Sequence, residues 1–335
     1  MTEKFNKCKK NSRKIVTILL VSLLLTGCET DISVFDNYEI PLSQSSEQDI
    51  SEGTTADNID SEFLSADICV VPKKKQSQKD SFMTAGASLI FDNTHNKMLY
   101  ADNIYTKMYP ASTTKIVTAL VALKYGNLND EVTISYNATH INEYGAKLCG
   151  FAEGDKITLK KLLYSFLICS GNDAGIAIAE HIAGSVDKFA AMMNKEVKAL
   201  GCSGSNFVNP HGLHDDNHYT TPYDLYLVFH ELLKYDVFMD IINHSSYKAE
   251  FNGADGNKKT LWFTSTDKYL LGSAKAPEGV TVIGGKTGTT SLAGSNFILY
   301  SKNSNGNSYI SVVMHASDSF SLYSQMSHLL ELENQ

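Results

Sequence analysis

Residues 110–123 read PASTTKIVTALVAL, in which Ser112 is followed three positions later by Lys115. Pro110 ends the extended segment before the serine, and the apolar spacing of residues 116–123 predicts a helix that begins beside it. At a helix start, a serine hydroxyl lies near unpaired backbone N–H groups and the positive end of the helix dipole. The i, i+3 spacing places Lys115 on the same face, where a neutral lysine can take the proton of an attacking serine.

Two further short motifs follow in the chain, Ser170-Gly-Asn172 and Lys286-Thr-Gly288. In a chain of this length, the Ser-x-x-Lys and Ser-x-Asn patterns are each expected about once by chance. Lys-Thr-Gly occurs once, against a chance expectation of roughly 0.1 or below. Since only Ser112 is followed by a strongly apolar helical run, it is the candidate nucleophile. The other copies of the first two patterns are Ser185–Lys188, Ser265–Lys268, Ser135–Asn137 and Ser301–Asn303.

Four segments carry a resemblance to a known family: Pro110–Lys115, Ser170–Ala174, Asn209–Leu213 and Gly284–Thr289. They resemble the D-alanyl-D-alanine carboxypeptidases, which are low-molecular-mass penicillin-binding proteins of the serine acyltransferase superfamily. The similarity runs over most of the globular part of the chain. It implies a serine-type D-Ala-D-Ala carboxypeptidase, a hydrolase that needs no metal and no other cofactor.

The resemblance also implies a role for each motif residue. Ser112 would attack the peptide carbonyl, Lys115 would take its proton, and Ser170 would relay a proton toward the leaving amine. The backbone N–H groups of Ser112 and Thr289 would form the oxyanion hole, whose donors are typically worth about 3–4 kcal/mol. The substrate-binding residues would be Asn172, Lys286, Thr287, Gly288 and Thr289.

The implied substrates are peptidoglycan stem peptides that end in D-Ala-D-Ala, and β-lactam antibiotics would acylate Ser112 as covalent inhibitors. The same motifs also fit a β-lactam sensor with slow turnover, a DD-endopeptidase or transpeptidase, and a class A β-lactamase. A class A β-lactamase needs a glutamate after Ser-x-Asn to activate the deacylating water, and residues 201–214 contain none. The deacylation rate and the acceptor distinguish these alternatives from the expected carboxypeptidase.

The chain departs from the family pattern because it lacks a suitable arginine. Family members commonly carry an arginine near the C-terminal helix that grips the substrate carboxylate, and its place falls near Leu322. Arg13 is the only arginine in the sequence. Because Arg13 lies in the basic segment at the N-terminus, within the predicted signal peptide, bidentate binding of the carboxylate by an arginine is excluded. Lys286, Thr287 and Thr289 are left to hold the carboxylate. The additional C-terminal β-domain and amphipathic anchor of many relatives are also not expected.

The apolar pattern predicts an α+β fold, with a sheet built from strands at both chain ends and helices between them. The resemblance implies the same architecture, an antiparallel sheet flanked by helices, with a helical subdomain that carries Ser170 and Asn172. The predicted strands cover residues 87–91, 98–101, 280–283, 297–300 and 309–314. The predicted helices cover residues 116–123, 159–168, 174–182, 186–200, 221–233 and 322–332.

Residues 1–27 are predicted to be a lipoprotein signal peptide. A basic segment precedes an apolar run over residues 15–25, which is too short to span a bilayer, since about 20 residues are needed. Leu25-Thr-Gly-Cys28 resembles a bacterial lipobox, so lipidation of Cys28 is expected. The alternative is an N-terminal membrane anchor that stays uncleaved.

Residues 28–80 are rich in Ser, Asp, Glu and Gln and are predicted to form a disordered polar tether. Residues 81–335 are predicted to form the catalytic domain. Together with lipidation of Cys28, this organisation predicts an extracytoplasmic protein, anchored by lipid to the outer face of the cell membrane.

The charge balance argues against a nucleic-acid partner. The chain has 29 Lys and Arg against 37 Asp and Glu, and its basic residues are concentrated at the N-terminus. Without residues 1–27 the chain keeps 23 basic and 36 acidic side chains and has no arginine. Nucleic-acid binding relies on basic patches, so no nucleic-acid partner is expected.

The remaining cysteines and histidines give weaker signals. No Cys-x-x-Cys pair occurs among Cys69, Cys149, Cys169 and Cys202, which are expected to be buried or free thiols. The alternative is a disulfide, for which the four cysteines allow three pairings between which the sequence does not choose. A cluster of histidines and aspartates has a spacing that resembles a set of metal ligands, but it does not form the His-Glu-x-x-His motif. We expect this cluster to be a polar surface loop. Its members are His211, His214, Asp215, Asp216 and His218. Gly285-Lys-Thr287 does not complete a phosphate-binding loop, because position 280 is valine.

Overall fold

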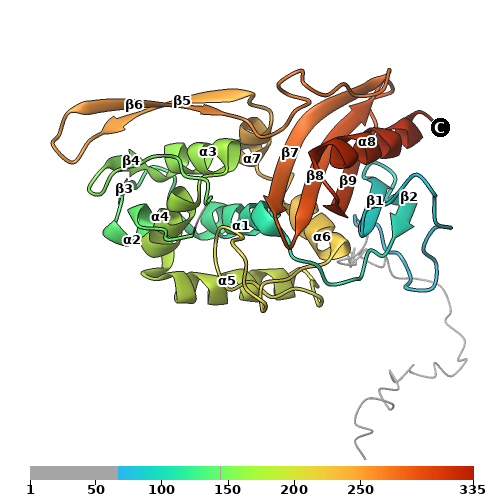
Figure 1. Cartoon of the computed structure of the whole chain (residues 1–335), viewed down its shortest axis with the longest axis horizontal. Helices are drawn as coiled ribbons and strands as arrows, with labels where there is room; N and C mark the ends of the chain where they lie inside the picture. The colour runs from blue at the N-terminus through green and yellow to red at the C-terminus, as the bar shows by residue number, and fades with distance from the viewer. Residues whose placement is uncertain (1–66, 144) are drawn as a thin grey trace, which may run out of the picture. The chain divides into compact units, whose positions relative to one another are not determined.

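The computed structural model describes residues 67–143 and 145–335 (Figure 1). The predicted signal peptide and the predicted lipidation site Cys28 lie outside the described residues. Within the described ranges, no helix has the length and apolar character needed to cross a membrane.

A five-stranded antiparallel sheet joins the two ends of the described chain, in the order β2-β1-β9-β8-β7. Strand β1 pairs with β9, so that Leu89 lies opposite Val312. This arrangement confirms the predicted α+β fold with a sheet built from both chain ends. The strands are β1 (Ala87–Asp92), β2 (Lys97–Asp102), β7 (Val280–Thr290), β8 (Gly294–Asn303) and β9 (Ser308–Ala316).

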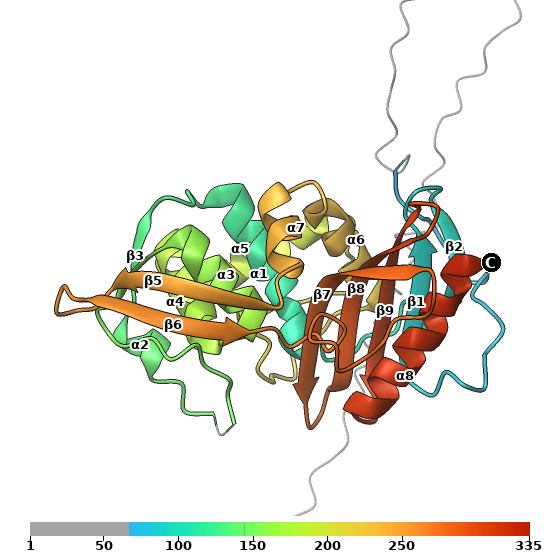
Figure 2. The ribbon, with the colours of Figure 1, turned by 90° about the horizontal axis from the view of Figure 1, so that it is seen from above.

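Both faces of this sheet are covered because its strands are apolar on both sides. Successive strand residues point to opposite faces. Leu89 and Phe91 therefore lie in the large core with the helices, whereas Ile90 packs in a second core beneath α8 (Ser319–Leu330). Figure 2 shows α8 along one face of the sheet. The chain continues from α8 into the short helix η2 (Glu331–Asn334).

Helix α1 (Lys115–Tyr125) is the centre of the helical part. Its residues from Lys115 to Ala122 are all buried, which marks a helix surrounded by other elements. A 3-10 turn, η1 (Ala111–Thr114), precedes it and carries Ser112. Helices α3 (Leu159–Cys169), α4 (Asn172–Ala183), α5 (Val186–Ala199) and α6 (Pro222–Leu232) pack against α1, whereas α2 (Tyr136–Thr139) packs on α4 and α7 (Asp236–Ile242) packs on α3.

A second antiparallel sheet, in the order β3-β4-β5-β6, was not anticipated from the sequence. Its first two strands are only three residues long, and its last two mix exposed and buried positions, so the apolar signal is weak. The β5–β6 hairpin lies along α3 (Figure 1). The strands are β3 (Glu131–Thr133), β4 (Lys156–Thr158), β5 (Ser246–Asn252) and β6 (Lys258–Thr264).

The packed domain begins before residue 81, the boundary predicted for it. Cys69 and Val71 are only 2% and 3% exposed. The Cys69 N–H donates to the Tyr226 hydroxyl at 2.8 Å, and the Tyr223 hydroxyl donates to the Cys69 carbonyl at 2.9 Å. Residues 67–80 were assigned to the tether because they hold few large apolar side chains, but Cys69 and Val71 are buried in the large core, whereas Val70 is exposed.

Candidate active site

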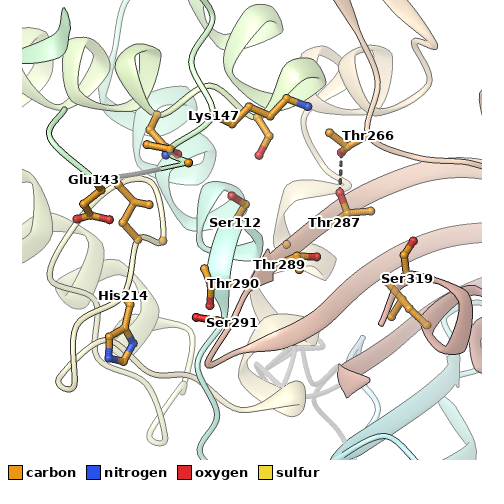
Figure 3. A pocket seen from close by; sticks show the side chains of 18 of the residues that line it. Ser112, Glu143, Lys147, His214, Thr266, Thr287, Thr289, Thr290, Ser291 and Ser319 are labelled. Carbon is orange, nitrogen blue, oxygen red and sulfur yellow. Dashed lines mark hydrogen bonds between the residues drawn. The ribbon is translucent and has the colours of Figure 1, made fainter. Parts of the chain in front are cut away.

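A cavity of about 530 Å³ lies where η1, the start of α4 and strand β7 meet. Ser112 faces this cavity (Figure 3), with Thr287 and Thr289 of β7 on one side and the loop that carries Glu143 and Lys147 on the other. The cavity thus gathers several of the residues that the sequence singled out, from three distant parts of the chain: Ser112, Ser170, Asn172, Thr287, Gly288 and Thr289.

Lys115 lies behind Ser112 and is completely buried. Its Nζ lies 2.9 Å from the Ser112 Oγ and donates to the Asn172 Oδ1 at 2.8 Å and to the His211 carbonyl at 2.6 Å. Burial, followed by the charge of nearby Lys286, holds the pKa of Lys115 well below its usual value. A neutral amine within hydrogen-bonding distance of a serine hydroxyl has the geometry of a general base.

Ser170 adopts a strained backbone conformation at the end of α3. Its φ of 66° lies in the left-handed region, which costs a non-glycine residue about 1–2 kcal/mol. Its Oγ accepts a hydrogen bond at 3.0 Å from the Nζ of Lys286. Strain of this kind often marks a functional position. The turn directs the Ser170 hydroxyl into the cavity instead of letting it cap a helix.

Lys286 is the second buried lysine of the site, with 1% of its surface exposed. Its Nζ also donates to the Thr287 carbonyl at 2.8 Å. Burial, followed by the charge of Lys147, lowers the pKa of Lys286 to about 7. The charge on Lys286 therefore favours the neutral form of Lys115.

Strand β7 passes close to the backbone of η1 at Gly288. A Cβ atom at this position would lie 2.6 Å from the Ser112 nitrogen and 2.8 Å from the Thr113 nitrogen. Since both atoms belong to the backbone, no side-chain rotation can relieve the contact. The glycine of the Lys-Thr-Gly motif therefore allows the strand to approach the serine turn.

The segment between β6 and β7 supplies further cavity residues that the sequence did not reveal. The Thr287 Oγ1 donates to the Thr266 Oγ1 at 2.6 Å, and Lys268 also lines the cavity. Thr266 and Lys268 belong to Ser265–Lys268, a segment that has the Ser-x-x-Lys pattern but is not followed by an apolar helix. Leu322, where the family arginine was expected, also lines the cavity. Nothing local in the sequence signals the approach of this segment to β7.

The prediction that the residues around His211 form a polar surface loop is wrong for two of the histidines, which are buried. His211 and His218 are 8% and 2% exposed. The His218 Nε2 lies 2.7 Å from the Thr114 Oγ1, and burial lowers the pKa of His218 to about 4. Gly212 lies so close to Ala111 that a Cβ would come within 1.8 Å of its carbonyl oxygen. This loop is thus a buried support of η1 and Lys115.

The described residues contain no group of His, Cys, Asp or Glu arranged to hold a metal ion. His214, the exposed member of the histidine loop, pairs with Asp216 at 3.3 Å and packs against Tyr109.

Comparison with known proteins indicates the family of this chain. The sequence profile of Peptidase_S11, described as D-alanyl-D-alanine carboxypeptidase, matches residues 73–318. The chain is 33% identical to D-alanyl-D-alanine carboxypeptidase DacF of Bacillus subtilis, over 56% of this chain and 47% of that protein. It is 32% identical to D-alanyl-D-alanine carboxypeptidase DacA of Haemophilus influenzae, over 69% of this chain and 57% of that protein. The chain thus spans about half the length of these curated relatives.

Solved structures show the same fold. The crystal structure of the Streptomyces K15 DD-transpeptidase superposes with a TM-score of 0.70 and 26% identity, covering 77% of this chain and 99% of that one. Penicillin-binding protein 5 from Haemophilus influenzae superposes with a TM-score of 0.66 and 29% identity, covering 76% of this chain and 72% of that one.

Proposed function

Because the chain belongs to the D-alanyl-D-alanine carboxypeptidase family, we propose that it is a serine-type hydrolase that removes the terminal D-alanine from peptidoglycan stem peptides. The observation that carries the proposal is the contact between the buried Lys115 Nζ and the Ser112 Oγ at 2.9 Å. Burial favours the neutral amine, and a neutral amine beside the hydroxyl can accept the serine proton.

In the proposed acylation step, the Ser112 Oγ attacks the carbonyl carbon of the D-Ala–D-Ala bond while Lys115 takes the hydroxyl proton. The carbonyl oxygen becomes an oxyanion, stabilised by the N–H groups of Ser112 and Thr289. Collapse of this intermediate breaks the C–N bond, and a proton reaches the leaving amine through Ser170. Its partner Lys286 stabilises the proton network, as their 3.0 Å contact supports.

Hydrolysis of the acyl-enzyme completes the cycle. Water attacks the ester carbonyl, Lys115 accepts a water proton, and the Ser112 Oγ leaves as the serine hydroxyl. The amide oxygen of Asn172 accepts a hydrogen bond from Lys115, which leaves the amide NH₂ able to donate to the substrate backbone.

The substrate carboxylate is proposed to bind at the Thr287 end of the cavity. Thr287 and Thr266 offer adjacent hydroxyls, and Lys268 supplies a positive charge among the lining residues. Lys268 is only partly buried, and its Nζ lies 5.3 Å from the centre of the Tyr323 ring. A lysine binds as a point charge, so it selects for a carboxylate less strictly than the bidentate fork of an arginine.

Two alternative activities use the same residues. Slow deacylation would make the protein a β-lactam sensor, whereas fast deacylation of penicillin would make it a β-lactamase. Glu143 also lines the cavity. However, Glu143 comes before the Ser-x-Asn motif in the chain, whereas the catalytic glutamate of class A β-lactamases comes after it. Measurement of penicillin turnover beside D-alanine release distinguishes these alternatives.

The proposed location is extracytoplasmic, with the membrane as a partner through a lipid on Cys28. The sequence of residues 1–28 supports this proposal through its basic head, short apolar run and lipobox. Incorporation of labelled palmitate into the parent chain and its loss in Cys28→Ala would support lipidation, and labelling of both would contradict it.

The decisive experiment measures D-alanine release from a Lys-D-Ala-D-Ala peptide by the full chain. The matched variants are Ser112→Ala and Ser185→Ala, since Ser185 begins a second Ser-x-x-Lys sequence and caps α5. Release by the parent and Ser185→Ala, with none by Ser112→Ala, supports the proposal. Equal release by all three excludes Ser112 as the nucleophile. Covalent attachment of penicillin to the parent without D-alanine release favours the sensor.

A further inference from the structure

Two buried cysteines face each other directly behind the Ser170 turn. The Sγ atoms of Cys149 and Cys169 lie 3.1 Å apart, about 1 Å beyond the length of a disulfide bond. Cys169 is the last residue of α3, and Cys149 lies in the connection between α2 and β4. Cys149 is 9% exposed and Cys169 is 6% exposed.

The other two described cysteines have different surroundings. The Cys202 Sγ contacts the Asp224 carbonyl at 3.5 Å, at the start of α6. The Cys69 backbone is instead hydrogen-bonded to the hydroxyls of Tyr223 and Tyr226 of α6. Of the three pairings that the sequence allows, the tertiary structure therefore favours the one that joins Cys149 to Cys169.

We propose that Cys149 and Cys169 form a disulfide bond that fastens residues 147–150 to the turn Ser170–Asn172. The reaction requires a disulfide oxidant of the small-thiol class, such as oxidised glutathione. The Cys169 thiolate attacks the oxidant to give a mixed disulfide and one small thiol. The Cys149 thiolate then displaces the second small thiol. Two S–H bonds are lost, one S–S bond forms, and the two protons end on the released thiols.

The environment of the two sulfurs supports this order of attack. The hydrogen bond from Cys149 lowers the pKa of Cys169, whereas burial raises the pKa of Cys149 well above its usual value. Cys169 is thus the better initial nucleophile, because the thiolate is the attacking species. Exported proteins meet oxidising conditions in which such bonds persist.

The bond would act on residues that the proposed reaction uses. The Asn172 N–H donates to the Lys147 carbonyl at 2.7 Å, and the Cys149 N–H donates to the Asp173 carboxylate at 2.8 Å. A Cβ at Gly171 would lie 2.3 Å from the Cys149 Sγ, so the turn packs directly on this sulfur. The disulfide would therefore hold the strained Ser170 turn and the Lys147 wall of the cavity together.

The first test identifies the bond by mass. The full chain in detergent is treated with oxidised glutathione, both in its native state and during refolding, so that burial cannot hide the reaction. Free thiols are then alkylated under denaturing conditions before proteolysis. We expect the Cys149 and Cys169 peptides to be joined, to separate on reduction, and to remain joined in Cys202→Ala. Alkylation of both cysteines in both samples, or a bond to any other cysteine, overturns the proposal.

The second test measures what the bond does. The closed loop contains about 21 residues, so we expect reduction to lower the Tm by about 5–10 °C and to speed amide exchange in residues 147–150 and 170–174. The Tm of the double variant Cys149→Ala/Cys169→Ala should not respond to reductant. Equal Tm and equal exchange in the oxidised and reduced parent would overturn the fastening role. Neither readout requires peptidase activity, so this proposal can fail independently of the proposed function.

Discussion

The close approach of β7 to the serine turn makes Gly288→Ala a sensitive test of the proposed oxyanion hole. The added Cβ would lie 2.6 Å from the Ser112 nitrogen, 2.8 Å from the Thr113 nitrogen and 3.0 Å from the Pro110 oxygen, whereas ordinary contact begins at 3.4 Å. The strand must therefore move by about 0.8 Å relative to η1, a shift comparable to the misplacements of about 1 Å that cost roughly 100-fold in rate.

The proposed oxyanion donors lie on the two sides of this contact, since one is the N–H of Ser112 and the other the N–H of Thr289. Separating them should weaken transition-state stabilisation by about 3–4 kcal/mol, equivalent to a 10²–10³-fold loss in rate. We expect kcat/KM for D-alanine release and the rate of penicillin acylation to fall together, because both reactions form an oxyanion at the same place. Thermal unfolding, measured in parallel, separates this loss from loss of fold.

Gly253→Ala is the matched control, since Gly253 lies in the β5–β6 hairpin, away from the cavity. Its added Cβ would meet the side-chain ends of Lys259 and Asp255, which can rotate away. We expect its kcat/KM to stay within about twofold of the parent. A Gly288→Ala enzyme that retains its fold and keeps more than about a third of the parental kcat/KM would refute the reasoning.

Three further predictions concern charge. Lys286→Gln should move the acidic limb of the pH profile of kcat/KM to higher pH, because it removes a cation that lowers the pKa of Lys115. An unchanged acidic limb, or activity that stays flat down to about pH 4, would argue against a lysine base. Lys268→Met should raise KM about tenfold (~1.4 kcal/mol) for a peptide with a free C-terminal carboxylate, whereas the exposed Lys275→Met should not; equal effects would remove Lys268 from the site. Burial raises the pKa of Glu333 to about 7, so the folded chain retains a proton that the unfolded chain releases, and stability should fall as pH rises from about 4.5 to 7. Urea unfolding at pH 5 and 8 tests this dependence of stability on pH. Glu333→Gln should reduce the dependence, and greater stability of the parent at pH 8 than at pH 5 would contradict it.

Local pattern was sufficient for the long elements of the fold. Helices α1, α3 and α6 and strands β8 and β9 have long apolar runs, and their existence follows from the sequence. Strands β3 to β6 do not, because they are short or lie half exposed and depend on α3 and on one another for burial. The start of the packed domain was placed too late for a similar reason, since Cys69 and Val71 are buried in the large core and Cys69 is hydrogen-bonded to distant α6.

The sequence by itself determined the candidate nucleophile, because the Ser112–Lys115 spacing and the apolar run after it act within one helix turn. Tertiary structure alone decided that α1 is central, and that its burial holds the pKa of Lys115 low. It also decided the neighbours that no spacing reveals, namely Thr266 and Lys268 beside Thr287 and the His211 carbonyl beneath Lys115. The physical reason is that periodicity acts over a few residues, whereas desolvation and hydrogen-bond partners come from segments that meet only when the chain is packed.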